Sequence, residues 1–139
     1  KLLGTRLRVI GTSAVTNTSG VLNPTWTCAI DNVRFNITNP WTSSINNWNL
    51  CESPSQSAGR HVLTINATST GGNTFWLDQI RYQPLANMST SLVNPTVIIE
   101  HGDPAVRYLS GNWMKLTDSA MYTLQTGSVV SLTFKGRSW

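Results

Sequence analysis

Apolar and polar residues alternate with a period of two over most of the chain. Within residues 5–10, Leu7 and Val9 fall on one side of an extended backbone, and Arg6 and Arg8 on the other. Successive side chains of a β-strand point to opposite faces of a sheet, so this pattern predicts strands with one buried face. Heptads and long stretches of period 3.6 are missing from the sequence, which argues against coiled coils and helical bundles.

The same pattern predicts nine short strands, separated by clusters of Gly, Pro, Asn and Ser. They cover residues 5–10, 25–30, 32–38, 60–67, 74–82, 97–100, 105–109, 121–124 and 128–134. Short strands with frequent turns predict an all-β protein built as an antiparallel β-sandwich. A chain of 139 residues, 40% of them hydrophobic, is long and apolar enough to form the core of one domain.

Residues 84–96 do not fit a strand pattern. This stretch is framed by prolines and shows no strong period. Structureless segments of this length are uncommon inside compact domains, so it is interpreted as a linker. It divides the chain into a larger β-sandwich portion, 1–83, and a strand-rich segment, 97–139.

Charge is scarce in this chain. Charged residues make up 12% of it, against about 25% in a typical globular domain. Asn, Ser and Thr take their place and supply a third of the residues. The pI of about 9.5 reflects a lack of acids, and the scattered cations form no patch for a nucleic acid. No segment approaches the ~20 apolar residues of a membrane span.

Two cysteines, Cys28 and Cys51, are too few for a zinc site and could form a disulfide or remain two buried thiols. Glycosylation sequons bear on this choice. The chain has four, at Asn17, Asn36, Asn66 and Asn87.

A sequence rich in Asn, Ser and Thr produces sequons by chance, so their positions decide. Alternation places Asn36 opposite the apolar residues of its strand, and Asn66 likewise. Asn17 and Asn87 lie in loops rich in Ser and Thr. All four can carry a glycan, which predicts a secreted, extracellular or cell-surface glycoprotein. In that compartment a Cys28–Cys51 disulfide is expected.

Several strands resemble a family of secreted jelly-roll, galactose-binding-like β-sandwich modules common in filamentous fungi, especially basidiomycetes. Residues 59–66 (GRHVLTIN) and 75–82 (FWLDQIRY) are similar to the last two strands of that module, and 4–11 (GTRLRVIG) to a strand in its middle. Residues 103–108 (DPAVRY), 110–113 (SGNW) and 127–136 (GSVVSLTFKG) resemble its front half. The resemblance implies a jelly-roll sandwich made of two half-modules.

The order of these halves is reversed, because the back half of the module comes first. A half-sandwich leaves strand edges and an apolar face open, so each half needs a complement. Either a longer chain of successive modules supplies it, or segment 97–139 of one copy packs on another copy. The second arrangement predicts a non-catalytic structural protein that assembles head to tail into a fibre or surface layer. Its interface would consist of Val130, Leu132 and Phe134.

The alternative function is a carbohydrate-binding, lectin-like module of a cell-wall or adhesion protein. Trp41 and Trp48 lie in the Asn-rich stretch 39–51, and two exposed, coplanar indoles would form a platform for a polysaccharide. Packing of this loop against the sandwich or a neighbour is the competing interpretation. The strand positions of the other tryptophans indicate core or interface residues, at Trp26, Trp76 and Trp113.

No catalytic motif is recognisable in the sequence, and a hydrolase is only a third interpretation. His61 alternates in phase with Leu63 and Ile65 and is expected to be a partly buried strand residue. Glu100, His101 and Asp103 share a turn, where adjacent side chains point in different directions. Six acids without an Asp-x-Asp cluster do not suggest a calcium site. We therefore expect no metal, no cofactor and no enzymatic activity.

Overall fold

The computed structural model describes residues 6–57, 59–83 and 96–136, and this part of the chain is all-β. The sequence-based prediction of an all-β sandwich is confirmed. The strands are β1 (Arg6–Ser13), β2 (Thr16–Thr18), β3 (Val21–Asn23), β4 (Thr25–Ile30), β5 (Val33–Phe35), β6 (Ile45–Glu52), β7 (Gly59–Thr68), β8 (Phe75–Leu77), β9 (Gln79–Gln83), β10 (Val97–Glu100), β11 (Val106–Ser110), β12 (Trp113–Leu116), β13 (Ala120–Thr123) and β14 (Ser128–Gly136). In the described ranges, no helix has the length and apolar character that crossing a membrane requires.

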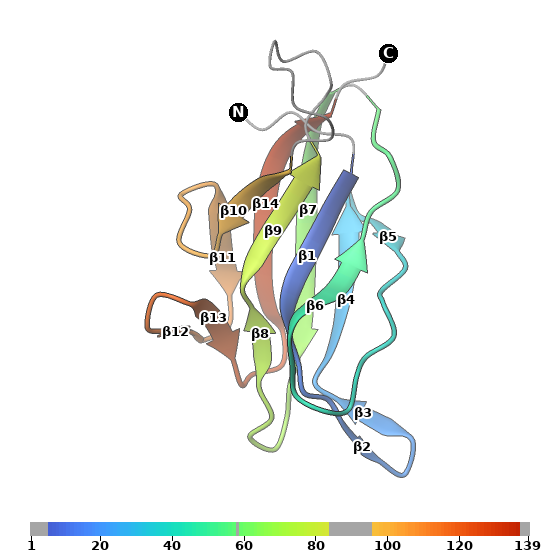
Figure 1. The fold of residues 1–139 in the computed structure, drawn as a ribbon, viewed down its shortest axis with the longest axis vertical. Helices are drawn as coiled ribbons and strands as arrows, with labels where there is room; N and C mark the ends of the chain where they lie inside the picture. The colour runs from blue at the N-terminus through green and yellow to red at the C-terminus, as the bar shows by residue number, and fades with distance from the viewer. Residues whose placement is uncertain (1–5, 58, 84–95, 137–139) are drawn as a thin grey trace.

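Two antiparallel sheets form the sandwich (Figure 1). The front sheet has the strand order β10-β9-β1-β6, and the back sheet has the order β11-β14-β7-β4-β5. A third sheet, β12-β13-β8, adjoins the front sheet, because β8 leads directly into β9. The β2-β3 hairpin extends from one end of the sandwich.

The core lies between the two main sheets. Leu7 and Val9 of β1 point inward from the front sheet, and Leu63 and Ile65 of β7 point inward from the back sheet. Arg6 and Arg8 of β1 and Asn66 of β7 face outward next to them, as the alternation predicted. Burial of apolar side chains of this size contributes about 1.5–3 kcal/mol each.

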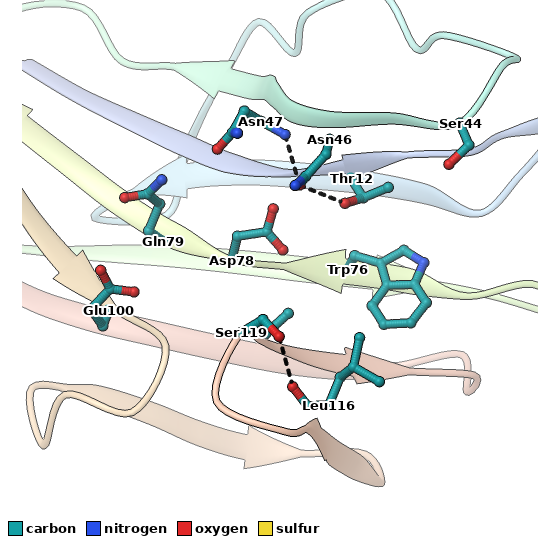
Figure 2. Close-up of a pocket in the computed structure, with 11 residues that line it drawn as sticks. Thr12, Ser44, Asn46, Asn47, Trp76, Asp78, Gln79, Glu100, Leu116 and Ser119 are labelled. Atoms are coloured by element: carbon teal, nitrogen blue, oxygen red, sulfur yellow. Dashed lines mark hydrogen bonds between the residues drawn. The ribbon is translucent and has the colours of Figure 1, made fainter.

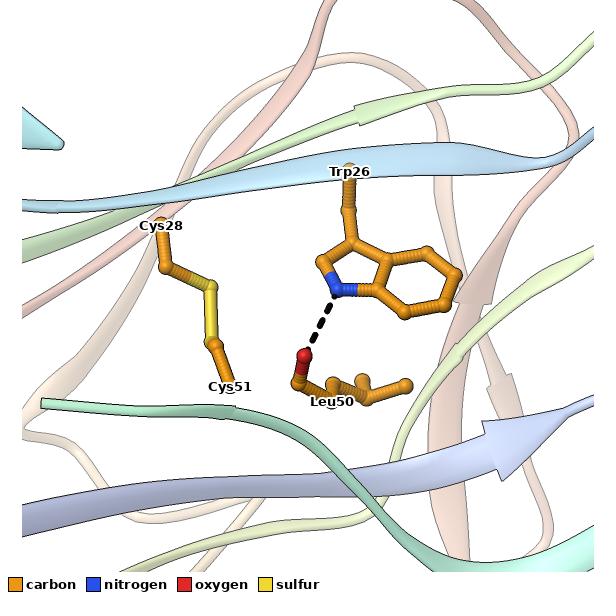
Figure 3. Close-up of a disulfide and its surroundings, with 4 residues drawn as sticks. All are labelled: Trp26, Cys28, Leu50 and Cys51. Carbon is orange, nitrogen blue, oxygen red and sulfur yellow. Dashed lines mark hydrogen bonds between the residues drawn. A yellow bond between two sulfur atoms is a disulfide. The ribbon is translucent and has the colours of Figure 1, made fainter. Parts of the chain in front are cut away.

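A disulfide joins the two sheets. Cys28 of β4 and Cys51 of β6 are bonded to each other and fully buried. Beside the disulfide, the Trp26 indole nitrogen donates a hydrogen bond of 3.0 Å to the Leu50 carbonyl oxygen (Figure 3). The predicted pairing is therefore present. Closing a loop of this length stabilises the fold by about 3 kcal/mol in the chain-entropy model.

All nine predicted strands occur, most of them with shifted ends, but the alternation missed four others. Residues 39–51 were interpreted as a loop, whereas most of this stretch belongs to β6, an edge strand of the front sheet. The predicted strand 74–82 is divided into β8 and β9 at Asp78. The short strands β2, β3 and β12 were also not predicted.

The two predicted portions of the chain share both sheets. Strand β10 pairs with β9 in the front sheet, and β14 pairs with β7 along its whole length in the back sheet. The proposed linker falls outside the described residues except for Thr96. Complementation of the two halves therefore takes place within one chain.

This closure changes the interpretation of the predicted assembly interface. Val130, Leu132 and Phe134 are buried, as expected, but against β7 of their own chain. The Phe134 ring lies 5.4 Å from the His61 ring, centroid to centroid. These three side chains are thus not exposed to a second copy, and head-to-tail assembly, which stays a prediction, would require strand exchange between copies.

Candidate functional site

Trp41 and Trp48 do not form the flat platform that the sequence suggested. Their ring centroids are 5.8 Å apart, but the ring planes are inclined by 40°. The Trp41 side chain is 49% exposed, whereas Trp48 packs against the core. The main chain of Trp41 is held by Ser13, whose hydroxyl donates to the Trp41 carbonyl oxygen and accepts from the Trp41 amide. The pair therefore does not form a flat sugar-stacking surface.

A groove of about 410 Å³ lies instead on the outer side of the front sheet and the adjoining third sheet, and we call it the polar groove. Figure 2 shows the Asp78 carboxylate between Asn46 and Ser119, with Trp76 at one end and Glu100 toward the other. Most of the residues that line it have polar side chains, while the Trp76 indole supplies a flat apolar surface. The lining residues are Thr12, Ser44, Asn46, Asn47, Trp76, Asp78, Gln79, Glu100, Leu116, Ser119 and Ala120.

A close approach of two strands positions Trp76. A Cβ atom at Gly11 of β1 would collide with the Trp76 carbonyl oxygen and lie 2.7 Å from Leu50 Cδ1. Only glycine therefore allows β8 to pack this tightly against β1. The Trp76 ring is half-buried and packs on Tyr122 of β13, with a centroid distance of 4.9 Å.

The break between β8 and β9 turns Asp78 toward the groove. Phe75 and Leu77 are buried, and the next buried position is Ile80 rather than residue 79. One extra residue at this point changes which positions of the strand point into the core, as in a β-bulge. The Asp78 amide still donates a 3.0 Å hydrogen bond to the Ile10 carbonyl oxygen, so the break stays attached to β1.

The opposite wall is fixed by an irregularity in β6. Asn47 has a positive φ of 56°, a conformation that Asn tolerates better than most residues. The Asn46 side-chain oxygen accepts hydrogen bonds from the Asn47 amide, at 2.9 Å, and from the Thr12 hydroxyl, at 3.1 Å. These bonds hold the Asn46 amide group at the rim of the groove (Figure 2).

Asp78 is the electrostatic centre of the polar groove. Burial raises the pKa of its carboxyl group to about 6, the negative charge of Glu100 acts in the same direction, and His101 acts in the opposite one. Its Oδ2 atom is buried and has no hydrogen-bond partner in the described part of the chain. A buried carboxylate oxygen without a donor is costly, so this atom is suited to accept a hydrogen bond from a ligand.

His61 serves the fold. His61 is buried, as predicted, and its Nδ1 atom lies 2.7 Å from Asp31 Oδ2, while its Nε2 atom lies 3.1 Å from the Ser57 carbonyl oxygen. The hydrogen bond with Asp31 raises the pKa of His61 and lowers that of Asp31. This pair ties the β4-β5 turn to β7.

The side chains of the acidic turn after β10 point in different directions, as expected. His101 is buried, Glu100 is exposed at the groove, and Asp103 accepts a 2.7 Å hydrogen bond from the Ala105 amide. Nowhere among residues 6–57, 59–83 and 96–136 do three or more His, Cys, Asp or Glu side chains gather as a metal ion would require.

The described sequons lie away from the polar groove. Asn17 is exposed on the β2-β3 hairpin, Asn36 is exposed next to β5, and Asn66 is exposed near the C-terminal end of β7 in the back sheet. Asn87 falls outside the described residues. Glycans at the three described positions would leave the outer face of the front sheet open.

The sequence predicted that Trp76 lies in the core or in an interface, and the assignment to the core is wrong. Trp26 is in the core and Trp113 packs against it, whereas Trp76 lines the polar groove. The sequence does contain a signal for the outward position of Trp76. Trp76 lies between Phe75 and Leu77, which both point inward, so alternation places it on the outer face of the strand. The three-position step from Leu77 to Ile80 indicates a bulge that exposes Asp78 and Gln79.

Comparison with known proteins gives no match. None of the family models, curated proteins or solved structures matches this chain. The resemblance to fungal jelly-roll modules consequently rests on the strand motifs of the sequence alone.

Proposed function

We propose that this chain is a non-catalytic, extracellular carbohydrate-binding module and that the polar groove holds the sugar. The observation that carries the proposal is the unpartnered Oδ2 atom of Asp78 next to the half-buried ring of Trp76. A pyranose ring has the matching chemistry. Its apolar face packs on an indole, and its hydroxyls donate hydrogen bonds to a carboxylate.

Further polar groups support recognition of a molecule rich in hydroxyls. The amide groups of Asn46, Asn47 and Gln79 and the Ser119 hydroxyl line the same groove, and each can donate and accept hydrogen bonds. A groove with a few convergent polar groups and one aromatic wall is typical of small-molecule sites. The open shape of this face would admit a segment of a longer glycan.

The extracellular part of the proposal rests on the disulfide and the exposed sequons. Structural disulfides persist in oxidising compartments, and the three described sequons present their Asn side chains to solvent. Glycans there would cover the back sheet and the hairpin. They would not compete with a ligand on the front sheet.

The proposal is tested by titrating the glycosylated protein with a panel of neutral oligosaccharides from β-glucan, chitin, mannan and galactan. Trp76→Ala should weaken binding of the preferred sugar about tenfold, equivalent to ~1.4 kcal/mol. Trp41→Ala, which removes an exposed indole outside the groove, is the matched control and should bind normally.

Two results would contradict the proposal. If Trp41→Ala lost affinity and Trp76→Ala did not, the sugar would bind at the tilted tryptophan pair. Release of reducing ends from a bound glycan during prolonged incubation would overturn the non-catalytic assignment. Thermal melting of each variant verifies that it is folded.

A further inference from the structure

Three arginines gather on the outer face of the front sheet, beyond the polar groove. Arg6 and Arg8 project from β1, and Arg81 projects from the neighbouring strand β9. Glu52 of β6 is paired with the first two, since its carboxylate lies 3.5 Å from Arg6 Nη1 and 3.0 Å from Arg8 Nε. One carboxylate therefore faces two guanidinium groups, and the third is not paired with it.

The strand register makes this arrangement unfavourable on its own. Arg8 and Arg81 are directly opposite each other in the β1-β9 pairing. Like charges at opposed positions of an antiparallel pair destabilise a sheet, whereas opposite charges stabilise it. An anion bound between the two arginines would remove this repulsion.

Arg81 also has an unsatisfied donor. Its Nε atom is buried and has no hydrogen-bond partner among the described residues. A cavity of about 260 Å³ is located here, and none of the described residues that line it is acidic. Its walls are formed by Arg6, Arg8, Arg81, Tyr82, Gln83 and Thr96. A buried guanidinium donor beside a cavity with cationic walls is suited to an oxyanion.

We propose that this cavity is a second subsite, which binds the carboxylate or sulfate group of an acidic glycan. Both ligands present paired oxygens that a guanidinium fork contacts through two parallel hydrogen bonds. The inference rests on the proposed function for its glycan part and names the class of sugar. Continuity of the two sites supports it: Gln79 of the polar groove and Arg81 are two positions apart on β9, a distance of roughly 7 Å along a strand.

Dextran, carboxymethyl-dextran and dextran sulfate of equal length provide matched probes, together with inorganic sulfate. At constant ionic strength, sulfate should shift the Arg81 Nε–H signal in ¹⁵N NMR spectra, while chloride should not. Both charged dextrans should bind about tenfold more tightly than dextran. Arg81→Gln should abolish that difference. Arg107→Gln, an equal loss of charge on the exposed back sheet, is the control and should retain it.

A structural role for Arg81 would give a different result. Arg81→Gln removes the like-charge contact with Arg8, so the melting temperature of this variant should equal or exceed that of the wild type. Equal affinity for charged and neutral dextrans, or equal losses in Arg81→Gln and Arg107→Gln, would overturn the anion subsite.

The two proposals can fail separately. If Trp76→Ala loses a neutral oligosaccharide and the charged dextrans gain nothing, only the acidic subsite is wrong. If no neutral sugar binds but sulfate and dextran sulfate bind through Arg81, the anion site stands and the neutral-sugar function is wrong. Dextran sulfate could also bind while inorganic sulfate leaves the Arg81 Nε–H signal unchanged. That result would place the acidic glycan elsewhere on the protein and overturn this site.

Discussion

The Asp78 carboxyl group combines properties that a purely structural residue does not need. It is partly buried at a strand break, Glu100 lies close enough to repel its charge, and its Oδ2 atom has no donor. Its pKa of about 6 lies above the ordinary value of 3.8. The folded protein therefore holds this proton more tightly than the unfolded chain does. Between these two values, the contribution of Asp78 to stability falls as the pH rises.

This shift predicts a pH-dependent affinity. If sugar hydroxyls donate to the ionised carboxylate, affinity should rise between about pH 5 and pH 7, with a midpoint near the pKa of about 6. Asp78→Asn should bind weakly at every pH and lose this dependence, whereas Glu100→Gln should keep it with a lower midpoint. Calorimetric titration across this range measures both effects.

The same substitution makes a prediction for stability. Relative to the wild type, Asp78→Asn should gain melting temperature as the pH rises from about 4 to 7, because it carries no desolvated charge. A constant difference between the two proteins over that range would contradict the raised pKa. The His61–Asp31 pair titrates alike in both proteins and cancels in the comparison.

Residue identity alone could not distinguish the tryptophans. Trp41 and Trp48 lie among asparagines, which made them the better candidates for sugar binding, and Trp76 fits an alternating strand. Their roles depend on the packing of neighbouring strands. Trp48 packs against the core, and Trp76 faces outward because it alternates with the inward-facing Phe75 and Leu77 of β8. For Trp76, the apolar residues on either side of it, Phe75 and Leu77, carried this information in the sequence.

At the scale of elements, the contact between β1 and β8 shapes the polar groove. Gly11→Ala should destabilise the fold by about 1–3 kcal/mol, since the new methyl group has no space against Trp76 and Leu50. It should also weaken sugar binding by displacing the Trp76 ring. Gly102→Ala is the control, because nothing lies within 4 Å of its Cβ position. Chemical denaturation of both variants measures the difference, and equal stability would disprove the tight contact.

Strands with strong alternation were predictable, and those rich in asparagine were not. Strands β4 and β10 match their predicted residues because β-branched and aromatic side chains mark them. Strand β6 carries three asparagines, which are depleted in strands, and its pairing with β1 and the disulfide at Cys51 override that local preference. The groove wall at Asn46 was missed for the same reason.

For the whole molecule, the decisive contact is the pairing of β14 with β7, which closes the sandwich within one chain. The sequence motifs predicted two halves that need a complement, but a sequence pattern carries no information on whether the complement belongs to the same copy. The chain places β14 between β11 and β7 in the back sheet. Every inward apolar side chain of β14 then packs on residues of its own copy.

This closure predicts a monomer in solution. Sedimentation velocity at micromolar concentration should show a single species with the mass of one glycosylated chain. Phe134→Asp should unfold it, because the substitution places an unpaired charge where the ring is 3% exposed. Val33→Asp, at a side chain that is 71% exposed, should remain folded and monomeric. Wild-type material that sediments as fibres, with folded monomers released by Phe134→Asp, would show that β14 is exchanged between copies and would restore the head-to-tail assembly.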